Sequence, residues 1–357
     1  MFGYPGVYMK TSDFDYFLPQ EQIAQRSVEP RDHSKLMLLD KHSGAVEHKQ
    51  FFEILDHLSK GDVLVMNDTK VFRARLHGQV NDKEIEVFLL RARENNEWEV
   101  MVRPGKHVSV SDKIVVGEMR GEVIEKTDVM RVQFDRTAED VVAYANEVGE
   151  IPVPPYVSEQ PSELEKYQIV YAQETGSVAA PTAGFHFTDE LLGKIREKGV
   201  EIVFVTLHVG LGTFRPVKTD TLEEHKMHAE FVSVNAQTAE RINHAKQQGR
   251  RVIAVGTTTV RTLEGVATKV LTFPHHGEET STPLPGQGYE GDVNLFIKPG
   301  FKFNVVDALI TNFHLPKSTL LALVSALAGR ENVLAAYGEA IKKGYRFYSF
   351  GDAMFIG

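Results

Sequence analysis

The stretch Val252-Ile-Ala-Val-Gly-Thr-Thr-Thr-Val-Arg261 contains the transition that decides the fold class. Four apolar residues typical of a buried strand end at Gly256, and hydroxyl residues open a helix directly after it. A strand that passes straight into a helix is the repeating unit of an α/β sheet. Free backbone N–H groups at such a helix start, together with the helix dipole, favour a bound carboxylate or phosphate. A well-capped structural helix explains this stretch equally well when it is taken alone.

Strand and helix signals alternate through the second half of the chain. Thr188 and Asn235 are typical N-caps, and each opens a predicted helix that ends at a glycine, Gly199 or Gly249. This alternation predicts an α/β main domain. The remaining predicted helices cover residues 258–267, 318–328 and 332–343, and the predicted buried strands cover 200–207, 252–255 and 308–312.

An all-β segment interrupts this pattern in the first half of the chain. Six or seven short apolar segments follow one another there, separated by turns rich in Asn, Asp, Gly and Pro. Hairpin-length connections between so many strands predict a small barrel-like domain. The predicted organisation is therefore an α/β catalytic domain over residues 1–60 and 137–357, an inserted β-barrel-like domain over 61–136, and a mobile surface loop at 273–291.

Composition excludes several kinds of site and compartment. The chain has 357 residues and no cysteine, which excludes a disulfide framework, a thiolate nucleophile and cysteine-ligated metal centres. Its N-terminus lacks the cationic and apolar regions of a signal peptide. The most apolar predicted helix, near residues 320–328, is too short to span a membrane. These features predict a cytoplasmic protein.

The net charge of −9 argues against a nucleic-acid partner, because phosphate binding needs Lys and Arg. Net charge alone is a weak criterion, since a local basic face can coexist with an acidic remainder. Most cations in this chain are more simply explained as solvated surface charges. The candidates for a basic face are Arg26, Arg31, Lys35, Lys70, Arg73, Arg75, Arg250 and Arg251.

Two other loops follow predicted strands. Thr311-Asn-Phe-His-Leu-Pro-Lys-Ser-Thr319 repeats the strand-to-helix transition, with His314 and Lys317 beside the helix start. His208-Val-Gly-Leu-Gly-Thr-Phe-Arg-Pro216 has two glycines that let the backbone approach a ligand closely. As a dinucleotide motif it is weak, because a third glycine is missing and Arg-Pro follows in place of a helix.

The segment His225-Lys-Met-His-Ala-Glu230 has two histidines at a spacing that metal sites use. It lacks the accompanying glutamate of a zinc-protease helix, so neutral catalytic or structural histidines explain it better than metal ligands do. A serine nucleophile is unsupported as well, because the chain has no Gly-x-Ser-x-Gly turn. We expect no metal site.

Taken in order, these loops resemble the S-adenosylmethionine:tRNA ribosyltransferase-isomerase family of queuosine biosynthesis. The resemblance covers nearly the whole chain. It departs in detail, since Phe185 replaces the family's usual leucine and Asp292-Val-Asn replaces a more typical Trp-Thr-Asp. Besides the loops above, the motifs that carry it are Phe14-Asp-Tyr-Phe-Leu-Pro19, Leu64-Val-Met-Asn-Asp-Thr-Lys-Val-Phe-Arg-Ala-Arg-Leu76, Ile151-Pro-Val-Pro-Pro-Tyr156, Tyr167-Gln-Ile-Val-Tyr171, Gly176-Ser-Val-Ala-Ala-Pro-Thr-Ala-Gly184, Ala179-Ala-Pro-Thr-Ala-Gly-Phe-His-Phe-Thr188 and Gly351-Asp-Ala-Met-Phe355.

The resemblance implies that S-adenosylmethionine is a substrate that donates its ribosyl carbon skeleton rather than its methyl group. The acceptor is 7-aminomethyl-7-deazaguanine at the wobble position of tRNA. The products are epoxyqueuosine-tRNA, adenine and methionine, and neither a redox cofactor nor a metal is required. The chain is expected to act as a monomer.

Residue roles follow as hypotheses. The catalytic candidates are His228, His208 and His314, with Glu230 as an orienting carboxylate. The substrate-binding candidates are Gly210, Gly212, Thr213, Phe214, Arg215, Thr257, Thr258, Arg261 and Lys317, and the tRNA-binding candidates are Lys70, Arg73 and Arg75. An S-adenosylmethionine-dependent RNA methyltransferase and a non-catalytic RNA-binding module remain as alternatives.

Overall fold

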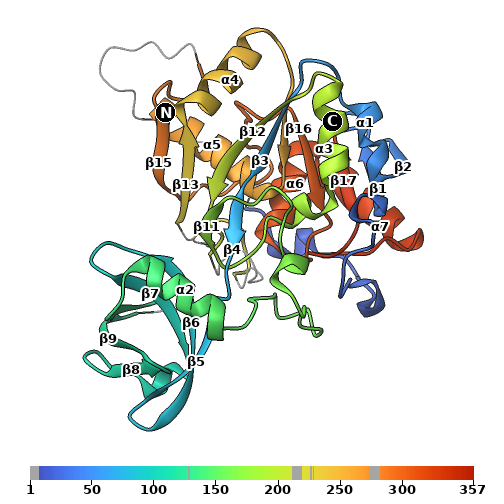
Figure 1. The fold of residues 1–357 in the computed structure, drawn as a ribbon. Coiled ribbons are helices and arrows are strands. Elements are labelled where there is room, and N and C mark those ends of the chain that lie inside the picture. Colours follow the sequence, from blue (N-terminus) through green and yellow to red (C-terminus); the bar gives the residue numbers. More distant parts are fainter. Residues whose placement is uncertain (1–7, 128, 211–218, 226, 228, 273–281) are drawn as a thin grey trace. The chain divides into compact units, whose positions relative to one another are not determined.

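The computed structural model describes residues 8–127, 129–210, 219–225, 227, 229–272 and 282–357. The chain divides into two compact units. The α/β unit comprises residues 1–68, 181–207 and 212–357, and the barrel unit comprises 69–180 and 208–211. Both predicted fold classes are therefore present, one in each unit (Figure 1).

A nine-stranded mixed sheet forms the centre of the α/β unit. Four neighbouring strands in its middle are parallel to one another, namely β12, β3, β14 and β16. Every residue of β3, β14 and β16 is buried, as expected for parallel strands covered on both faces. The sheet order is β15 (Gly288–Val293), β13 (Glu230–Asn235), β12 (Glu201–Leu207), β3 (Val63–Asn67), β14 (Val252–Val255), β16 (Ala308–Asn312), β17 (Ala353–Ile356), β1 (Lys35–Leu39) and β2 (Val46–Gln50).

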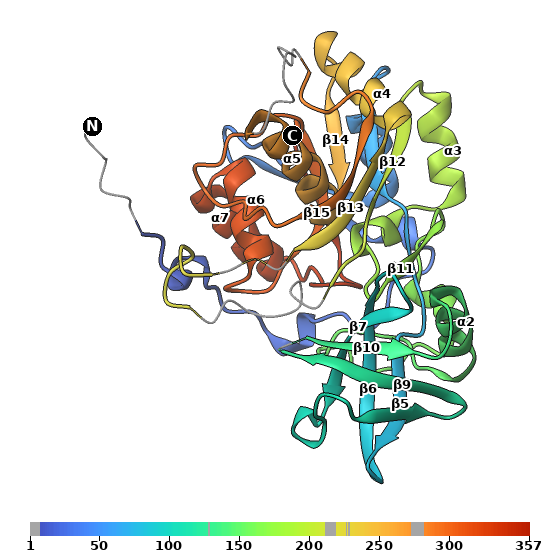
Figure 2. The same cartoon turned by 90° about the vertical axis from the view of Figure 1, so that its left-hand side faces the viewer.

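Helices cover this sheet, and Figure 2 shows α5 and α6 on one side of the central strands and α3 on the other. The predicted N-caps are confirmed, because the side chains of Thr188 and Asn235 accept hydrogen bonds from the backbone of Leu191 and Thr238. The helices of this unit are α1 (Ile54–His57), α3 (Asp189–Glu197), α4 (Ala236–Gln247), α5 (Thr257–Thr272), α6 (Thr319–Ala328) and α7 (Arg330–Lys342). Short 3-10 helices include η1 (Thr11–Phe14) and η7 (Thr182–His186).

The barrel unit is built around a closed six-stranded antiparallel barrel. Its core contains Trp98, Val100 and Val132, and α2 (Ala138–Val148) adds Val141 and Ala145. A short parallel pair, β4 (Thr69–Val71) and β11 (Glu174–Ser177), completes the unit. The barrel order is β10 (Met130–Phe134), β7 (Glu97–Arg103), β6 (Lys83–Ala92), β5 (Arg75–Val80), β8 (Lys113–Val116) and β9 (Met119–Lys126).

The unit boundaries differ from the predicted ones at both ends of the barrel. The predicted start at residue 61 assigned β3 to the barrel, but β3 pairs with β12 and β14 at the centre of the α/β sheet. The predicted end at residue 136 excluded α2 and β11, which pack and pair within the barrel unit. Of the predicted loop at 273–291, residues 273–281 lie outside the described residues and the last four belong to strand β15.

Among the described residues, no single helix is both long and apolar enough to cross a membrane. The pair α6 and α7 meets that test only when the two are counted together, and they meet at a bend of 112°.

Candidate functional site

Polar residues gather where the parallel strands of the α/β unit end. The carboxyl ends of β3, β12, β14 and β16 lie at one edge of the sheet, which is where open α/β sheets bind ligands. At the end of β3, Asp68 accepts a hydrogen bond from Thr206 of β12 at 2.8 Å. The antiparallel strand β13 begins at this same edge, because Val232, near its start, pairs with Leu207, the last residue of β12. We call this edge the carboxyl edge.

The turn at Gly256 sends the chain from β14 into α5. Gly256 has φ +87°, and an added Cβ would lie 3.4 Å from Thr258 Oγ1 and 3.6 Å from Ala183 Cβ. The start of α5 therefore packs closely against η7. Within the helix, Thr259 and Thr262 donate their hydroxyl protons to backbone carbonyls of Val255 and Thr258. Thr258 Oγ1, in contrast, is buried and has no hydrogen-bond partner in the described part of the chain.

Arg261 lies one turn into α5 and is only 5% exposed. Its Nη1 is 2.5 Å from Oε2 of Glu230, the first residue of β13. Its Nε and Nη2 are buried and have no hydrogen-bond partner among the described residues. A buried donor without a partner costs about 1–3 kcal/mol, so these two N–H groups and the Thr258 hydroxyl favour a bound anion.

The predicted residues Glu230 and Arg261 are thus brought together as an ion pair. The predicted role of Glu230 in orienting a histidine stays a prediction, because His228 lies outside the described residues. Thr257 and Thr258 open the same helix, so these four predicted residues form one group. His228, Gly212, Thr213, Phe214 and Arg215 lie outside the described residues.

A chain of buried side chains lies at the next strand, β16. Asn312, its last residue, contacts Thr182 Oγ1 through Oδ1 at 3.1 Å and His186 Nε2 through Nδ2 at 3.1 Å. His186 Nδ1 lies 2.7 Å from Ser34 Oγ. Burial, with the positive charges of Arg346 and Arg31, lowers the pKa of His186 to about 3. His186 is therefore a neutral hydrogen-bonding residue at physiological pH.

His314 is held by structural contacts two residues beyond β16. Its Nε2 lies 2.8 Å from Thr311 Oγ1, its backbone N–H donates to Tyr337 Oη at 3.0 Å, and its carbonyl accepts from Tyr16 Oη. Burial lowers the pKa of His314 to about 3. These contacts favour a neutral structural role over proton donation at neutral pH.

Lys317 is not part of the group around Arg261. Its ammonium forms an ion pair with Asp15 at 2.8 Å, and both side chains are about half exposed. Its backbone has φ +56° and donates a hydrogen bond to Phe14 O. The structure therefore ties Lys317 to the N-terminal segment.

His208 and Gly210 belong to the barrel unit. His208 Nδ1 lies 2.8 Å from Thr69 Oγ1, and its ring packs on Gly176, where an added Cβ would lie 2.7 Å from Nε2. Burial, with a smaller effect of Arg91, lowers the pKa of His208 to about 4. The imidazole is neutral at physiological pH and able to accept a proton.

The predicted tRNA-binding cations have different surroundings within the barrel unit. Lys70 is exposed on β4. Arg73 Nη1 donates to the carbonyl of Gly149 at 3.3 Å. Arg75 lies 3.6 Å from Glu86 and 4.0 Å from Glu150, so its charge is partly neutralised. Of the three, Lys70 alone is exposed, and the tRNA-binding role of all three stays a prediction.

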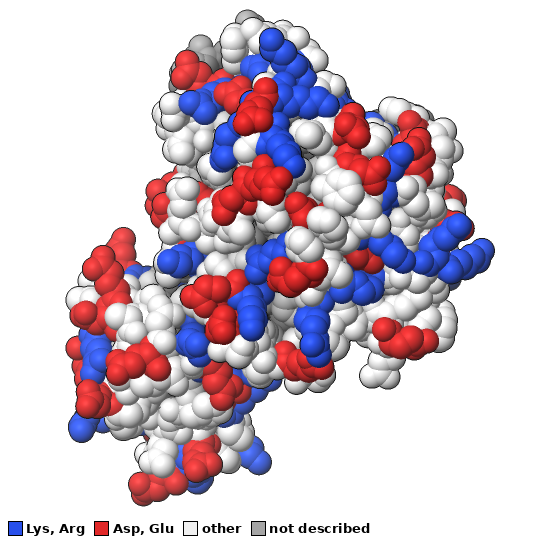
Figure 3. All heavy atoms as spheres, turned by 45° about the vertical axis from the view of Figure 1, so that its right-hand side comes forward, with Lys and Arg blue, Asp and Glu red and all other residues white. Residues whose placement is uncertain are grey.

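The other proposed cations are dispersed. Arg250 and Arg251 precede β14 at the amino end of the strands, where they pair with Glu201 and Asp62. On the face drawn in Figure 3, Lys and Arg side chains are interspersed with Asp and Glu side chains. This face has no extended single-sign area among the residues that the structure describes.

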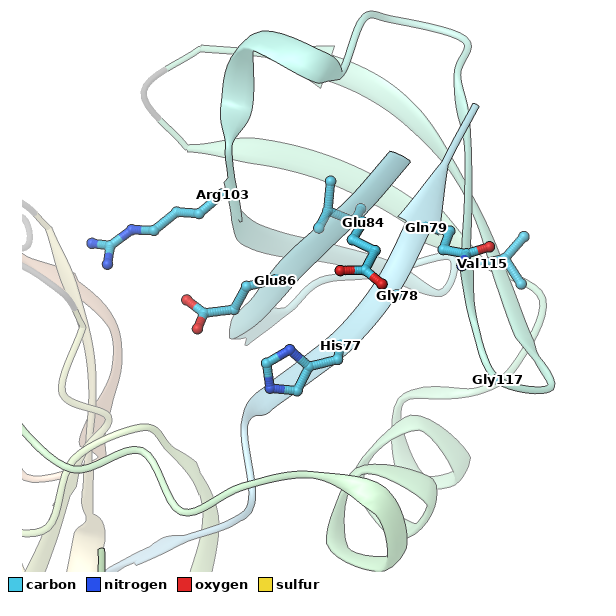
Figure 4. A pocket seen from close by; sticks show the side chains of 9 residues that line it. His77, Gly78, Gln79, Glu84, Glu86, Arg103, Val115 and Gly117 are labelled. Atoms are coloured by element: carbon cyan, nitrogen blue, oxygen red, sulfur yellow. The ribbon is translucent and has the colours of Figure 1, made fainter. Parts of the chain in front are cut away.

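The barrel itself carries an open hollow of about 710 Å³. Figure 4 shows the imidazole of His77 and the carboxylates of Glu84 and Glu86 around it. His77 also contacts Glu150 at 3.1 Å. Arg103 lines it as well, so two carboxylates face one guanidinium, a balance that disfavours an RNA phosphate. No group of three or more potential metal ligands is found among the residues described.

Several residues of the carboxyl edge were missed from the sequence. Asp68, Thr182, His186 and Asn312 all stand in motifs that carry the resemblance, but none was among the candidate site residues. Two of these, Asp68 and Asn312, are polar residues at or just after the end of a buried strand. That position was the signal that would have found them.

Comparisons with known proteins agree along the whole chain. The family described as "Queuosine biosynthesis protein" matches residues 11–356. The chain is 50% identical over 356 residues to an S-adenosylmethionine:tRNA ribosyltransferase-isomerase of Desulfitobacterium hafniense, and 49% identical over 356 residues to one of Acetivibrio thermocellus. Each match covers 98% of this chain and 100% of the relative.

A solved structure is similar as well. It is the crystal structure of an S-adenosylmethionine tRNA ribosyltransferase from Thermotoga maritima, with a TM-score of 0.55 and 37% sequence identity. The match covers 97% of this chain and 100% of the other.

Proposed function

We propose that this chain, which belongs to the queuosine biosynthesis protein family, is an S-adenosylmethionine:tRNA ribosyltransferase-isomerase. It transfers and isomerises the ribosyl moiety of S-adenosylmethionine onto 7-aminomethyl-7-deazaguanine at the tRNA wobble position. The products are epoxyqueuosine-tRNA, adenine and methionine. The methyltransferase and RNA-binding alternatives are not favoured, because relatives that match along the whole chain carry the ribosyltransferase-isomerase name. The enzyme works as a cytoplasmic monomer without a cofactor.

The observation that carries our assignment of the substrate site is the buried guanidinium of Arg261. S-adenosylmethionine ends in an amino-acid group, and a carboxylate accepts two parallel hydrogen bonds from an arginine. Arg261 Nε and Nη2, Thr258 Oγ1 and the N-terminus of α5 supply such donors. Glu230, beside Arg261, supplies a negative charge for the α-ammonium group. This group therefore binds the methionine half of the substrate.

The reaction requires a base that removes a proton, and it requires the tRNA amine to lie close to the sugar carbon. The sulfonium acidifies the adjacent C5′ proton, so that a neutral histidine can remove it and form an ylide. Adenine then leaves with a proton, the tRNA amine attacks the sugar carbon, and methionine departs as the epoxide closes. Because its pKa is lowered to about 4, the His208 imidazole is in the unprotonated state that a proton acceptor requires, and His228 keeps the same proposed role.

One assay tests the proposed function. The purified protein is incubated with S-adenosylmethionine and tRNA that carries the 7-aminomethyl-7-deazaguanine precursor. Release of adenine and methionine in equal amounts supports ribosyl transfer. S-adenosylhomocysteine would instead identify a methyltransferase, and tRNA binding without either product would identify a binding module.

A further inference from the structure

Four side chains form a continuous hydrogen-bond chain from the interior to the carboxyl edge. Ser34 Oγ contacts His186 Nδ1 at 2.7 Å, and His186 Nε2 contacts Asn312 Nδ2 at 3.1 Å. Asn312 Oδ1 contacts Thr182 Oγ1 at 3.1 Å. Ser34, His186 and Asn312 are buried, whereas Thr182 is only half-buried. The series of hydrogen bonds therefore ends at Thr182, the member of the four that is partly exposed.

The orientation of Asn312 sets the direction of this chain. A carboxamide oxygen only accepts hydrogen bonds and its nitrogen only donates them. Thr182 therefore donates its hydroxyl proton to Asn312 Oδ1, and His186 Nε2 accepts from Asn312 Nδ2. Because burial keeps His186 neutral, its single ring proton stands on Nδ1 and is donated to Ser34. Outward from Asn312, the Thr182 oxygen then offers only lone pairs.

Thr182 also lies next to the proposed methionine site. Its neighbour Ala183 packs against the turn at Gly256, from which α5 and Arg261 follow. Residues 183–187 are all buried, so the Thr182 side chain is the accessible polar group of this segment. The Thr182 oxygen, as a hydrogen-bond acceptor at this position, suits a hydroxyl or amino group of the substrate that donates a hydrogen bond.

We propose that Thr182 is a specificity-determining residue that accepts a hydrogen bond from a hydroxyl or amino group of S-adenosylmethionine, with Asn312 and His186 as positioning residues. The inference rests on the proposed function, since it takes S-adenosylmethionine as the ligand of the carboxyl edge. The ribosyl hydroxyls and the adenine amino group share the required donor chemistry. Analogues that lack one donor each distinguish between them.

The first test determines, in the unaltered protein, which group donates and which accepts in each hydrogen bond from Ser34 to Thr182. Nitrogen-15 NMR on histidine-labelled enzyme, with His186 assigned by comparison with the His186→Gln variant, reports which ring nitrogen carries the proton. We expect the proton on Nδ1. A proton on Nε2 would reverse the chain, turn Thr182 into a donor and overturn the inference. This measurement does not depend on catalytic activity.

The second test pairs substrate analogues with variants of Thr182. The analogues are the 2′-deoxy, 3′-deoxy and N6,N6-dimethyl forms of S-adenosylmethionine, and dissociation constants are measured by calorimetry. Thr182→Val should weaken binding of S-adenosylmethionine roughly 3- to 10-fold, and Thr182→Ser should restore it, because serine keeps the hydroxyl. One analogue should bind the unaltered enzyme more weakly than S-adenosylmethionine does. That analogue and S-adenosylmethionine should bind Thr182→Val with equal affinity.

Two outcomes separate this inference from the proposed function. If every analogue loses the same affinity in the unaltered enzyme and in Thr182→Val, Thr182 contacts no donor of the substrate and the inference fails while ribosyl transfer stands. If S-adenosylmethionine binds with the expected pattern but adenine and methionine are not released with precursor tRNA, the proposed reaction fails instead.

Discussion

The guanidinium of Arg261 and the carboxylate of Glu230 lie 2.5 Å apart, with side chains only 6% and 4% exposed. Arg261 lies one turn into α5, and Glu230 is the first residue of β13. The pair places an acceptor for an ammonium group next to donors for a carboxylate. Because both charges are buried in the α/β unit, each one offsets the free-energy cost of burying the other.

Removing one member of this pair should destabilise the fold. Arg261→Met leaves Glu230 buried without its countercharge, and the expected loss is about 3–5 kcal/mol in the free energy of unfolding. Urea denaturation measures it. The matched control is Arg241→Met, which breaks the exposed pair with Glu201 and should cost no more than about 1 kcal/mol. Equal losses for the two variants would mean that the buried Arg261–Glu230 pair contributes no more to the free energy of unfolding than an exposed pair does.

Arginine geometry should matter at position 261 beyond its charge. Arg261→Lys keeps a cation beside Glu230 but removes the Nε and Nη2 donors, so affinity for S-adenosylmethionine should fall roughly 10- to 100-fold. Calorimetric titration measures this. Arg250→Lys, at the opposite edge of the sheet, serves as the control and should leave the affinity unchanged. Unchanged affinity in Arg261→Lys would remove the bidentate contact.

The two remaining acid–base candidates can be ranked by turnover. If His208 or His228 transfers the proton, its replacement by Gln should lower turnover roughly 10²–10⁴-fold while S-adenosylmethionine still binds. Adenine release under single-turnover conditions gives the rate, and circular dichroism checks the fold. His314→Gln is the comparison, and we expect it to act mainly through stability. A folded His208→Gln variant with full turnover would exclude that residue.

Buried neutral histidines should make the fold sensitive to acid. The pKa values of His186 and His314 are lowered to about 3 in the folded state, whereas the unfolded chain has the ordinary value of about 6.5. Between these values the unfolded state binds more protons, so the free energy of unfolding falls as the pH drops from about 6.5 toward 3. Each histidine contributes up to about 1.4 kcal/mol per pH unit.

Urea unfolding at a series of pH values tests this dependence. His186→Gln should be less stable at pH 7 but show a smaller loss on acidification than the unaltered protein. His42→Gln, an exposed position, should leave the slope unchanged. A slope in His186→Gln equal to that of the unaltered protein would contradict the assignment.

Exposure should decide which cation of the barrel unit contacts tRNA. Lys70 is exposed, whereas Arg75 is held near Glu86 and Glu150. Lys70→Ala should lower the salt dependence of tRNA binding by about 0.7–0.9 in the slope of log affinity against log salt, as expected for one lost phosphate contact. Arg75→Ala should change that slope little. The reverse ranking would place the phosphate at Arg75.

Much of the fold followed from local patterns. Helix caps at Thr188 and Asn235 and the strand-to-helix transition at Gly256 depend on residues that are close in sequence, and the structure confirms them. The barrel was predictable for the same reason, because its strands are joined by short hairpins. β3 was not, since a run of four apolar residues, Val63 to Met66, looks alike in a barrel and in a parallel sheet. Its partners, β12 and β14, are far away in the chain.

The candidate site shows the same difference between what residues close in sequence determine and what residues far apart in sequence determine. Residue types and their order sufficed to indicate an α/β enzyme with a barrel, a family and a set of candidate residues, because motifs are local and a family's motifs keep their order. The pairing of Arg261 with Glu230, the donors left unsatisfied beside it, and the direction of the chain from Ser34 to Thr182 came from packing. Each joins residues on different strands and helices, and burial, which sets their charge states, is a property of the packed unit rather than of any segment.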